Sequence, residues 1–110
     1  MKRITYYIGL ETPTGPNEST FVGVRRAQAL DLLAGVYDAL TVTDTVGMWE
    51  GVEEPSLRVE VIIGEPEDEA GFSRIEQARE IAREIALTLE QDAVALTVEP
   101  LHHFQLITKD

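Results

Sequence analysis

The sequence predicts an α+β fold in which two helices cover one face of an antiparallel sheet. Hydrophobic patterns of period two and of helical period follow each other in the order strand, helix, strand, strand, helix, strand. Clusters of proline, glycine and acidic residues separate most of these segments. The 110 residues, 44% of them hydrophobic and 26% charged, suffice for one domain over 1–110 and are too few for two cores.

The first half of the chain begins with a predicted strand and a predicted helix. Apolar and polar residues alternate over 3–10, which is typical of a half-buried strand. Residues 11–18 hold two prolines and a glycine and are expected to form a loop. Ser19 or Thr20 then caps a helix that we expect over about 21–38, where apolar residues recur every three or four positions.

Two further strands are predicted to form an antiparallel hairpin. Residues 40–48 and 57–63 alternate, and threonines on one side of the first suit a half-exposed sheet surface. The segment from Gly47 to Ser56 is expected to be a long tip bounded by glycines. Asp44 interrupts the apolar side of its strand, which favours a bulge or a sheet edge; a functional acid is the alternative.

The second helix has a well-marked start. After an acidic loop over 64–69, Ser73 and Glu76 form a capping box, in which each side chain can satisfy a backbone amide of the first turn. An apolar stripe then runs from Ile75 to Leu89, with glutamate and arginine on the other face. That charged face is typical of a solvated helix surface.

The last strand is predicted over 93–99 and ends at Pro100, while 102–108 can pair back as an extra edge strand with Phe104 and Leu106 facing inward. The order of elements is that of the ferredoxin-like βαββαβ sandwich. Its helix-free face would be mixed in character and suits a subunit interface or a ligand platform, so we expect a homo-oligomer. The residues expected on this face are Thr5, Tyr7, Thr41, Thr43, Thr45, Arg58, Glu60, Ile62, Ala95 and Thr97.

Charge and composition restrict the classes of partner. A formal net charge of -11 argues against direct binding to nucleic acid or to an anionic membrane, both of which select for lysine and arginine. The absence of cysteine excludes disulfides and thiolate sites. No targeting segment or long apolar run is visible, so a cytoplasmic location is expected. An acidic surface that inhibits a basic partner, as in a phage or plasmid accessory protein, is one alternative function.

The predicted hairpin tip is the most distinctive stretch and the expected site of ligand or partner binding. It holds the only tryptophan, Trp49, three carboxylates and Ser56. An aromatic ring beside carboxylates can stack on a ligand and bond its polar edge, and Glu50, Glu53 or Glu54 could serve a small enzyme if burial separates their pKa values. The alternative is structural, with Trp49 covering the end of the sandwich and the glutamates solvated.

No other motif points to catalysis or to a cofactor. Nucleotide-binding, P-loop, zinc-protease and hydrolase motifs are absent, so no catalytic residue and no cofactor are assigned. His102 and His103 are adjacent and would point to opposite faces of a strand, so no metal site is expected even with Glu99 nearby. The first hypothesis is therefore a non-enzymatic binding or oligomerisation module.

Short segments spread over most of the chain form a distinctive set: Tyr7-Ile8-Gly9-Leu10, Leu40-Thr41-Val42, Gly47-Met48-Trp49-Glu50-Gly51 with Glu54-Pro55-Ser56 (a G-x-W-x-G…E-P-S segment), and Gln91-Asp92-Ala93-Val94. With these segments the chain resembles, over most of its length, a family of small, functionally uncharacterised α+β proteins of bacteria and their mobile elements. The resemblance implies the fold but no reaction. It also draws attention to Gln91, whose amide can bond backbone groups, and to Ser56, whose hydroxyl can close the hairpin neck.

Overall fold

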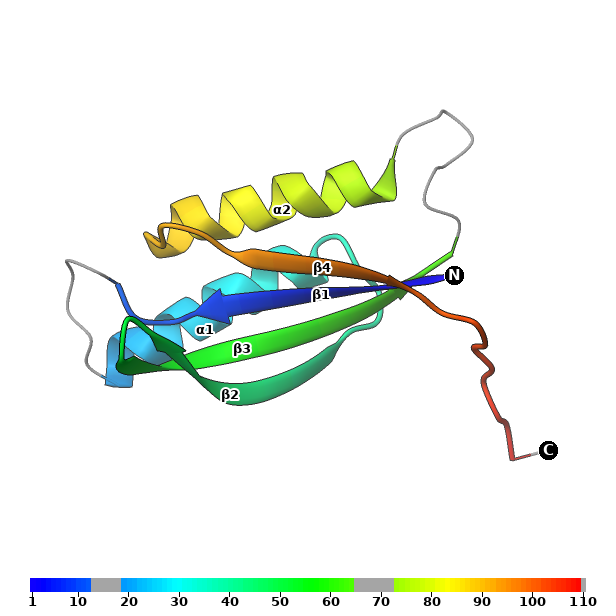
Figure 1. Cartoon of the computed structure of the whole chain (residues 1–110), viewed down its shortest axis with the longest axis horizontal. Helices are drawn as coiled ribbons and strands as arrows, with labels where there is room; N and C mark the ends of the chain where they lie inside the picture. Colours follow the sequence, from blue (N-terminus) through cyan, green and yellow to red (C-terminus); the bar gives the residue numbers. More distant parts are fainter. Residues whose placement is uncertain (13–18, 65–72, 110) are drawn as a thin grey trace.

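A computed structural model describes residues 1–12, 19–64 and 73–109. Within them the chain forms a four-stranded antiparallel sheet in the order β2-β3-β1-β4 and two helices (Figure 1). This arrangement confirms the predicted ferredoxin-like fold. The elements are β1 (Lys2–Gly9), α1 (Ser19–Ala34), β2 (Thr41–Trp49), β3 (Val52–Ile63), α2 (Arg74–Leu89) and β4 (Ala95–Pro100).

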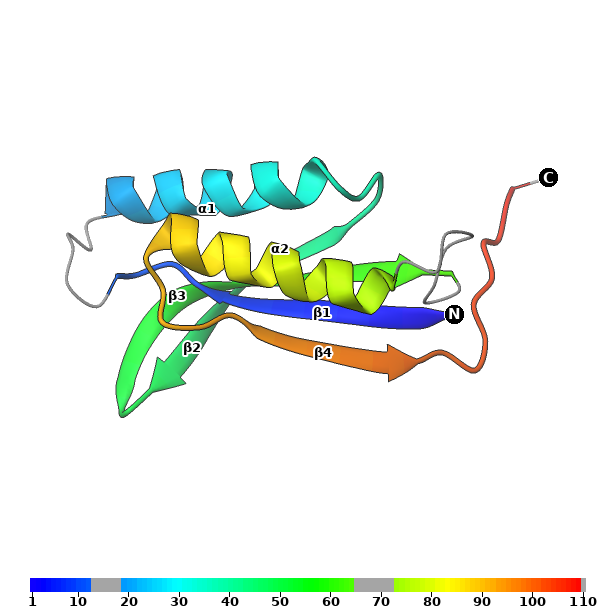
Figure 2. The ribbon, with the colours of Figure 1, turned by 90° about the horizontal axis from the view of Figure 1, so that it is seen from above.

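Both helices lie on the same side of the sheet and form one core with it (Figures 1 and 2). The central strands β1 and β3 contribute alternate residues, and the helices contribute one stripe each. Tyr6 is fully buried in this core, where its hydroxyl lies 2.7 Å from that of Tyr37. Other core residues are Ile4, Ile8, Leu10, Ala29, Leu33, Leu57, Val59, Val61, Ile63, Ala78, Ile81, Ala82, Ile85 and Leu89.

The register places the predicted residues on the opposite sheet face, away from the helices. Thr5 lies between Glu60 of β3 and Thr97 of β4, and Tyr7 lies between Arg58 and Ala95. Because side chains alternate along each strand, the threonines of β2 fall on this same face. We call this surface the open face.

Helix α1 is displaced from its predicted bounds. It begins at Ser19 and ends at Ala34, so Ser19 and Thr20 belong to the first turn rather than preceding it. The chain leaves the helix at Gly35, and the amides of Val36 and Tyr37 still bond the Leu33 carbonyl. The helix was predicted to extend to 38 because Tyr37 continues the apolar pattern. Tyr37 does pack on the same core, but it follows the helix instead of belonging to it. The loops predicted over 11–18 and 64–69 fall mostly outside the described residues.

Helix α2 confirms its predicted start. Ser73 precedes it, and the Ser73 hydroxyl accepts a hydrogen bond from the Glu76 amide at 3.2 Å. At the other end Glu90 adopts a left-handed conformation with φ 57°, and its amide and that of Gln91 bond the final turn. This cap turns the chain back toward β4.

The extra edge strand predicted over 102–108 is not formed. The Leu101 amide bonds the Met1 carbonyl at 2.9 Å, which continues the pairing of β4 with β1 by one residue. Beyond Leu101 the chain bends away from the sheet and does not pair back along β4 (Figures 1 and 2). Phe104 and Leu106, expected to face inward, are exposed. Residues 102–109 are named the C-terminal arm.

The long hairpin tip is also corrected. Strands β2 and β3 stay paired up to Trp49 and Val52, and only Glu50 and Gly51 form the turn. Both turn residues have positive φ, 51° and 79°, as a two-residue hairpin turn of this twist requires. The residues from Gly47 to Ser56 are thus mostly strand, because a tight turn leaves them free to pair.

Among the described residues no helix combines the length and apolar character needed to cross a membrane.

Candidate functional site

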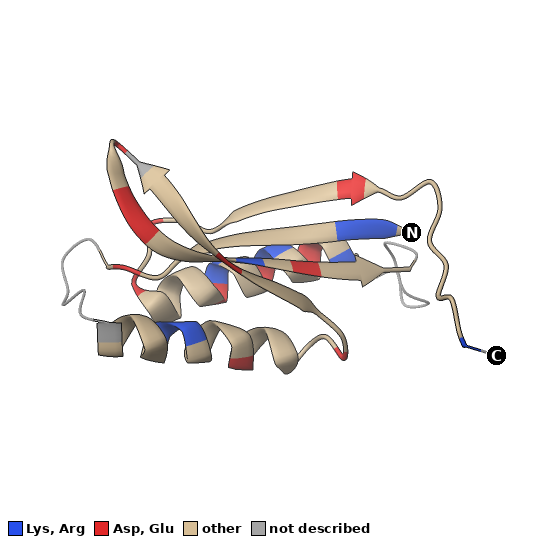
Figure 3. Cartoon of the chain, turned by 90° about the horizontal axis from the view of Figure 1, so that it is seen from below, with Lys and Arg blue, Asp and Glu red and all other residues tan. Residues whose placement is uncertain are grey.

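The open face carries a group of ion pairs at its centre and at one end. Arg3 of β1 bonds Glu99 of β4 at 2.7 Å, and Arg58 lies 3.5 Å from Glu60 on the same strand. Figure 3 shows basic residues at the start of β1 and an acidic residue at the end of the strand that pairs with it, β4. The Nε atoms of Arg3 and Arg58 are buried without a hydrogen-bond partner in this structure. Some of the hydrogen-bond donors on this face therefore have no acceptor among the described residues.

Apolar groups lie among these charges. Tyr7 is 42% exposed and Ile62 is 36% exposed, while Thr5 between the charged pairs is almost completely buried. No described helix covers these residues, because both helices lie on the other side of the sheet (Figure 2). A mixed surface of this kind suits contact with another macromolecule.

The β2–β3 hairpin projects beyond the rest of the sheet as a two-stranded ribbon (Figure 2). Strand β1 pairs with β3 only from Ser56 onward, so residues 46–55 have no third strand beside them. Val46, Met48 and Val52 are between 63% and 71% exposed on this ribbon. Exposed apolar residues at a projecting end are typical of a contact site.

Glu54 is the functional candidate with the most specific surroundings. Its carboxylate lies directly over Gly9 of β1, where a Cβ atom would come within 2.6 Å of Oε1. On its other side lies Gly47 of β2, its partner in the register. Two glycines beside one glutamate thus leave room for its side chain on the sheet.

The same position perturbs the titration of Glu54. Partial burial and the negative charge of Glu11 raise its pKa, while a hydrogen bond from the Glu11 backbone opposes the shift. Glu11 was not among the predicted site residues. It follows β1 directly, and only the pairing of β1 with β3 brings it beside Glu54.

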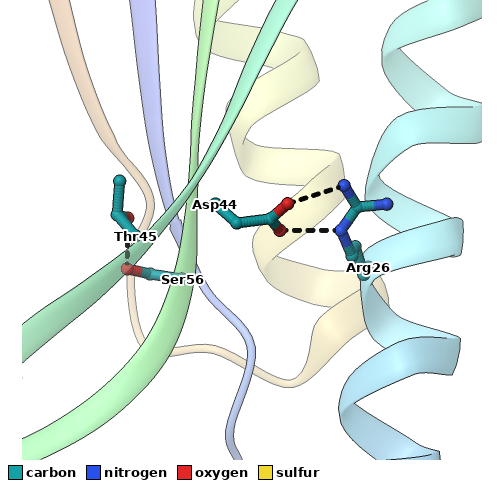
Figure 4. A network of polar contacts seen from close by, with 4 residues as sticks. All are labelled: Arg26, Asp44, Thr45 and Ser56. Atoms are coloured by element: carbon teal, nitrogen blue, oxygen red, sulfur yellow. Dashed lines mark hydrogen bonds and ion pairs between the residues drawn. The ribbon is translucent and has the colours of Figure 1, made fainter.

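Hydrogen bonds fix the neck of the hairpin near Glu54. The hydroxyls of Ser56 and Thr45 lie 2.8 Å apart across the two strands (Figure 4), and the Leu10 amide bonds the Pro55 carbonyl at 3.0 Å. The Gln91 side-chain amide donates to the Glu11 carbonyl. The predicted structural roles of Ser56 and Gln91 are confirmed, and both position backbone around Glu54.

Asp44 lies on an edge strand, as predicted, but at no bulge. Strand β2 is the outer strand of the sheet, and its register with β3 is regular through Asp44. Both carboxylate oxygens of Asp44 accept hydrogen bonds from Arg26 of α1, at 2.8 and 3.1 Å (Figure 4). These bonds lower the pKa of Asp44 and raise that of Arg26. Asp44 therefore ties α1 to the sheet edge.

The hairpin carboxylates are not brought together. Glu50 lies in the turn and is exposed, and Glu53 and Glu54 point to opposite faces of β3. Parts of Glu53 and Glu54 line one shallow hollow together with Val46 and Pro55. The side chain of Trp49 lies outside the described part of the structure, so its predicted role stays a prediction.

The two histidines lie on the C-terminal arm and are exposed. His103 contacts the Gln105 side chain at 3.2 Å. Within residues 1–12, 19–64 and 73–109 no group of three histidine or acidic side chains is arranged to hold a metal ion.

Comparisons with solved structures identify the fold but not the function. A phage SAM lyase in its apo state matches with a TM-score of 0.61 at 15% identity, over 89% of this chain and 78% of the other. The same enzyme in complex with S-methyl-5'-thioadenosine matches with a TM-score of 0.52 at 16% identity, over 89% and 79%. A DUF3240 family protein from Shewanella baltica OS155 matches with a TM-score of 0.55 at 9% identity, over 97% of both chains.

No family model matches the chain, and no curated protein matches it. Identities of 9–16% carry the fold alone. A protein of uncharacterised family is thus among the structural neighbours, while the resemblance based on the G-x-W-x-G…E-P-S segment stays a prediction.

Proposed function

We propose that the chain is a self-associating binding module whose open face contacts a second copy of itself. The observation that supports this is the composition of that face. It combines exposed Tyr7 and Ile62 with partly satisfied ion pairs, and the described helices leave it uncovered. Burying such a surface against a partner would remove apolar area from water.

Charge favours a second copy as the partner. The open face holds Arg3 and Arg58 against three carboxylates, those of Glu54, Glu60 and Glu99, so it is close to neutral. The whole chain carries a formal net charge of -11. Two copies would therefore repel each other less through this face than through surfaces that carry more of the net charge, and its mixed signs can pair across a symmetric interface.

Sedimentation velocity at micromolar concentration tests this proposal. We expect the natural chain to associate and Tyr7→Asp to weaken association by about tenfold or more, which corresponds to 1.4 kcal/mol. Phe21→Asp is the matched control, because Phe21 is equally exposed, at 42%, but belongs to α1 on the other side of the sheet. A chain that stays monomeric, or equal effects of the two variants, would reject the open face as the interface.

A second candidate function is binding of a small cationic molecule beside Glu54. The specific observation is that the Glu54 carboxylate lies over Gly9 and close enough to Glu11 for that charge to raise its pKa, so a bound cation would stabilise both carboxylates. This candidate includes the enzyme alternative raised by the hairpin glutamates. The predicted contribution of Trp49 and Ser56 to ligand binding belongs to the same proposal, whereas that of Glu50 and Glu53 does not, because these side chains lie away from Glu54.

Isothermal titration calorimetry distinguishes this candidate from the first. S-adenosylmethionine, which carries a sulfonium charge, is a suitable probe because a SAM lyase shares the fold, and S-methyl-5'-thioadenosine serves as its uncharged control. We expect S-adenosylmethionine to bind at least tenfold more tightly than the control and Glu54→Gln to remove the difference. Equal or undetectable binding of both compounds would reject a cation site at Glu54.

A further inference from the structure

The C-terminal arm carries large apolar side chains that are exposed to solvent instead of packing on the domain. Leu106 and Ile107 are 79% and 78% exposed, and Phe104 is 44% exposed. In an extended segment Phe104 and Leu106 point to one side, because their positions differ by two. Three large apolar residues among the eight residues of the arm are unusual for a solvated segment.

A surface of complementary character lies on the outer side of β4. Within the described residues this strand is an edge of the sheet and pairs with β1 alone, so its outer backbone groups are available to another strand. Beside it is an open hollow of about 290 Å³ between α2 and the first part of β4. The apolar part of its lining consists of Ala82, Ala86, Ala93, Val94 and Leu96, and Arg79, Arg83 and Asp92 complete the lining.

The arm is directed away from the hollow of its own chain. The bond from the Leu101 amide to the Met1 carbonyl holds Leu101 beside β1, one residue beyond Pro100. The hollow lies at the start of β4, whereas the arm leaves from its end, and Figures 1 and 2 both show the arm departing from the body. To reach its own hollow the arm would have to turn back and run along the length of β4.

We propose that residues 102–108 of one copy bind as an added strand along the outer edge of β4 of a second copy. Phe104 and Leu106 would then enter the hollow between α2 and β4. Backbone hydrogen bonds to the free edge would supply affinity, and the two side chains would set the register. This interface uses a different surface from the open face and does not depend on contact through it.

Engineered cysteines test the proposal directly, because the chain has none of its own. We expect Leu106→Cys of one chain and Ala86→Cys of another, mixed and oxidised, to form a disulfide between the two chains. The matched control replaces Ala86→Cys by Glu84→Cys, which lies two residues away on α2 and does not line the hollow. We expect at least tenfold less linked product in the control mixture.

Two outcomes would overturn the proposal. Equal cross-linking in both mixtures would mean random collision. An internal disulfide in a dilute single chain that carries both Leu106→Cys and Ala86→Cys would mean that the arm folds back on its own domain.

A sedimentation experiment separates this inference from the open-face proposal. We expect Leu106→Asp to weaken association at least tenfold, while Gln105→Asp, which adds the same charge on the other side of the arm, leaves it unchanged. If only Tyr7→Asp acts, the arm inference fails and the open-face proposal stands. If only Leu106→Asp weakens association, the open-face proposal fails and the arm inference stands.

Discussion

The two faces of the sheet are formed by the same strands but differ in burial and in polarity. On the helix side of the central part of the sheet, alternate residues of β1 and β3 are 3% exposed or less: Ile4, Tyr6, Ile8, Leu57, Val59, Val61 and Ile63. On the open face the residues between them include ion pairs and the exposed Tyr7. The described helices cover the helix side of the sheet, whereas no described element covers the open face. Substitutions on the helix side should therefore change folding, and those on the open face should change binding.

The largest effect is expected on the helix side. Ile85→Asp should unfold the domain, because it would place an unpaired charge at a fully buried position of α2. We expect a loss of about 4 kcal/mol or more, which is a large part of the stability of a small domain. Leu87→Asp on the same helix is the control, since Leu87 is 75% exposed and its loss should be small. Urea unfolding followed by circular dichroism measures both, and equal losses would contradict the assigned helix face.

A smaller effect is expected from the contact between the Tyr6 and Tyr37 hydroxyls in the core. Tyr6→Phe removes the bond with Tyr37 and leaves that hydroxyl without its partner, which should cost about 1–2 kcal/mol. Burial and the Tyr37 bond raise the pKa of Tyr6 above its usual value.

The raised pKa of Tyr6 gives this prediction a pH dependence. Because the pKa of Tyr6 is higher in the folded chain, the unfolded chain loses the Tyr6 proton at a lower pH than the folded chain does. The titration of this group therefore leaves the free energy of unfolding unchanged below pH 10 and decreases it above pH 10. The difference in unfolding free energy between the natural chain and Tyr6→Phe should therefore shrink above pH 10. A constant difference up to pH 11 would contradict the burial of the Tyr6 hydroxyl.

A still smaller effect is expected at Glu54 on the open face. Because the pKa of Glu54 is raised in the folded state, the ionised carboxylate destabilises the fold at neutral pH. This destabilisation decreases as the pH falls toward 4.5, the ordinary pKa of a glutamate, because the carboxyl group becomes protonated. Glu54→Gln should therefore raise stability slightly at pH 7 and change it less near pH 4. Thermal unfolding at the two pH values checks the sign, and a loss of stability at pH 7 would mean that the Glu54 carboxylate is held by favourable bonds.

The smallest effect is expected on the other side of the same strand. Glu53 is exposed and points away from Glu54, so Glu53→Gln should change stability by less than about 0.5 kcal/mol. The same unfolding measurements apply, and a larger loss would show that Glu53 is paired.

The sequence was most informative where a local rule acts over a few residues. Ser73 was identified as a helix cap from its spacing to Glu76, and the alternation of β1 and β3 indicated which side chains would be buried. It was least informative where turns and termini depend on pairing. The tight turn at Glu50 and Gly51 was hidden because a glutamate at positive φ has no strong sequence signal.

The candidate site was predicted only in part for a related reason. Glu54 and Ser56 were identified from a distinctive segment, but grouping Glu54 with Glu50 and Glu53 assumed that nearness in sequence means nearness in space. On a strand, adjacent residues point to opposite faces, so Glu54 meets Glu11 of a different segment instead.

By itself the sequence determined the order of elements, the core face of each strand and the start of α2, because these depend on hydrophobic period and local capping. Only the tertiary structure decided that Gly9 and Glu11 surround Glu54, that Asp44 binds Arg26, and that the arm leaves the sheet without pairing. Each of these depends on contacts between segments far apart in the chain. Strand order and register fix such contacts, and no local pattern encodes either one alone.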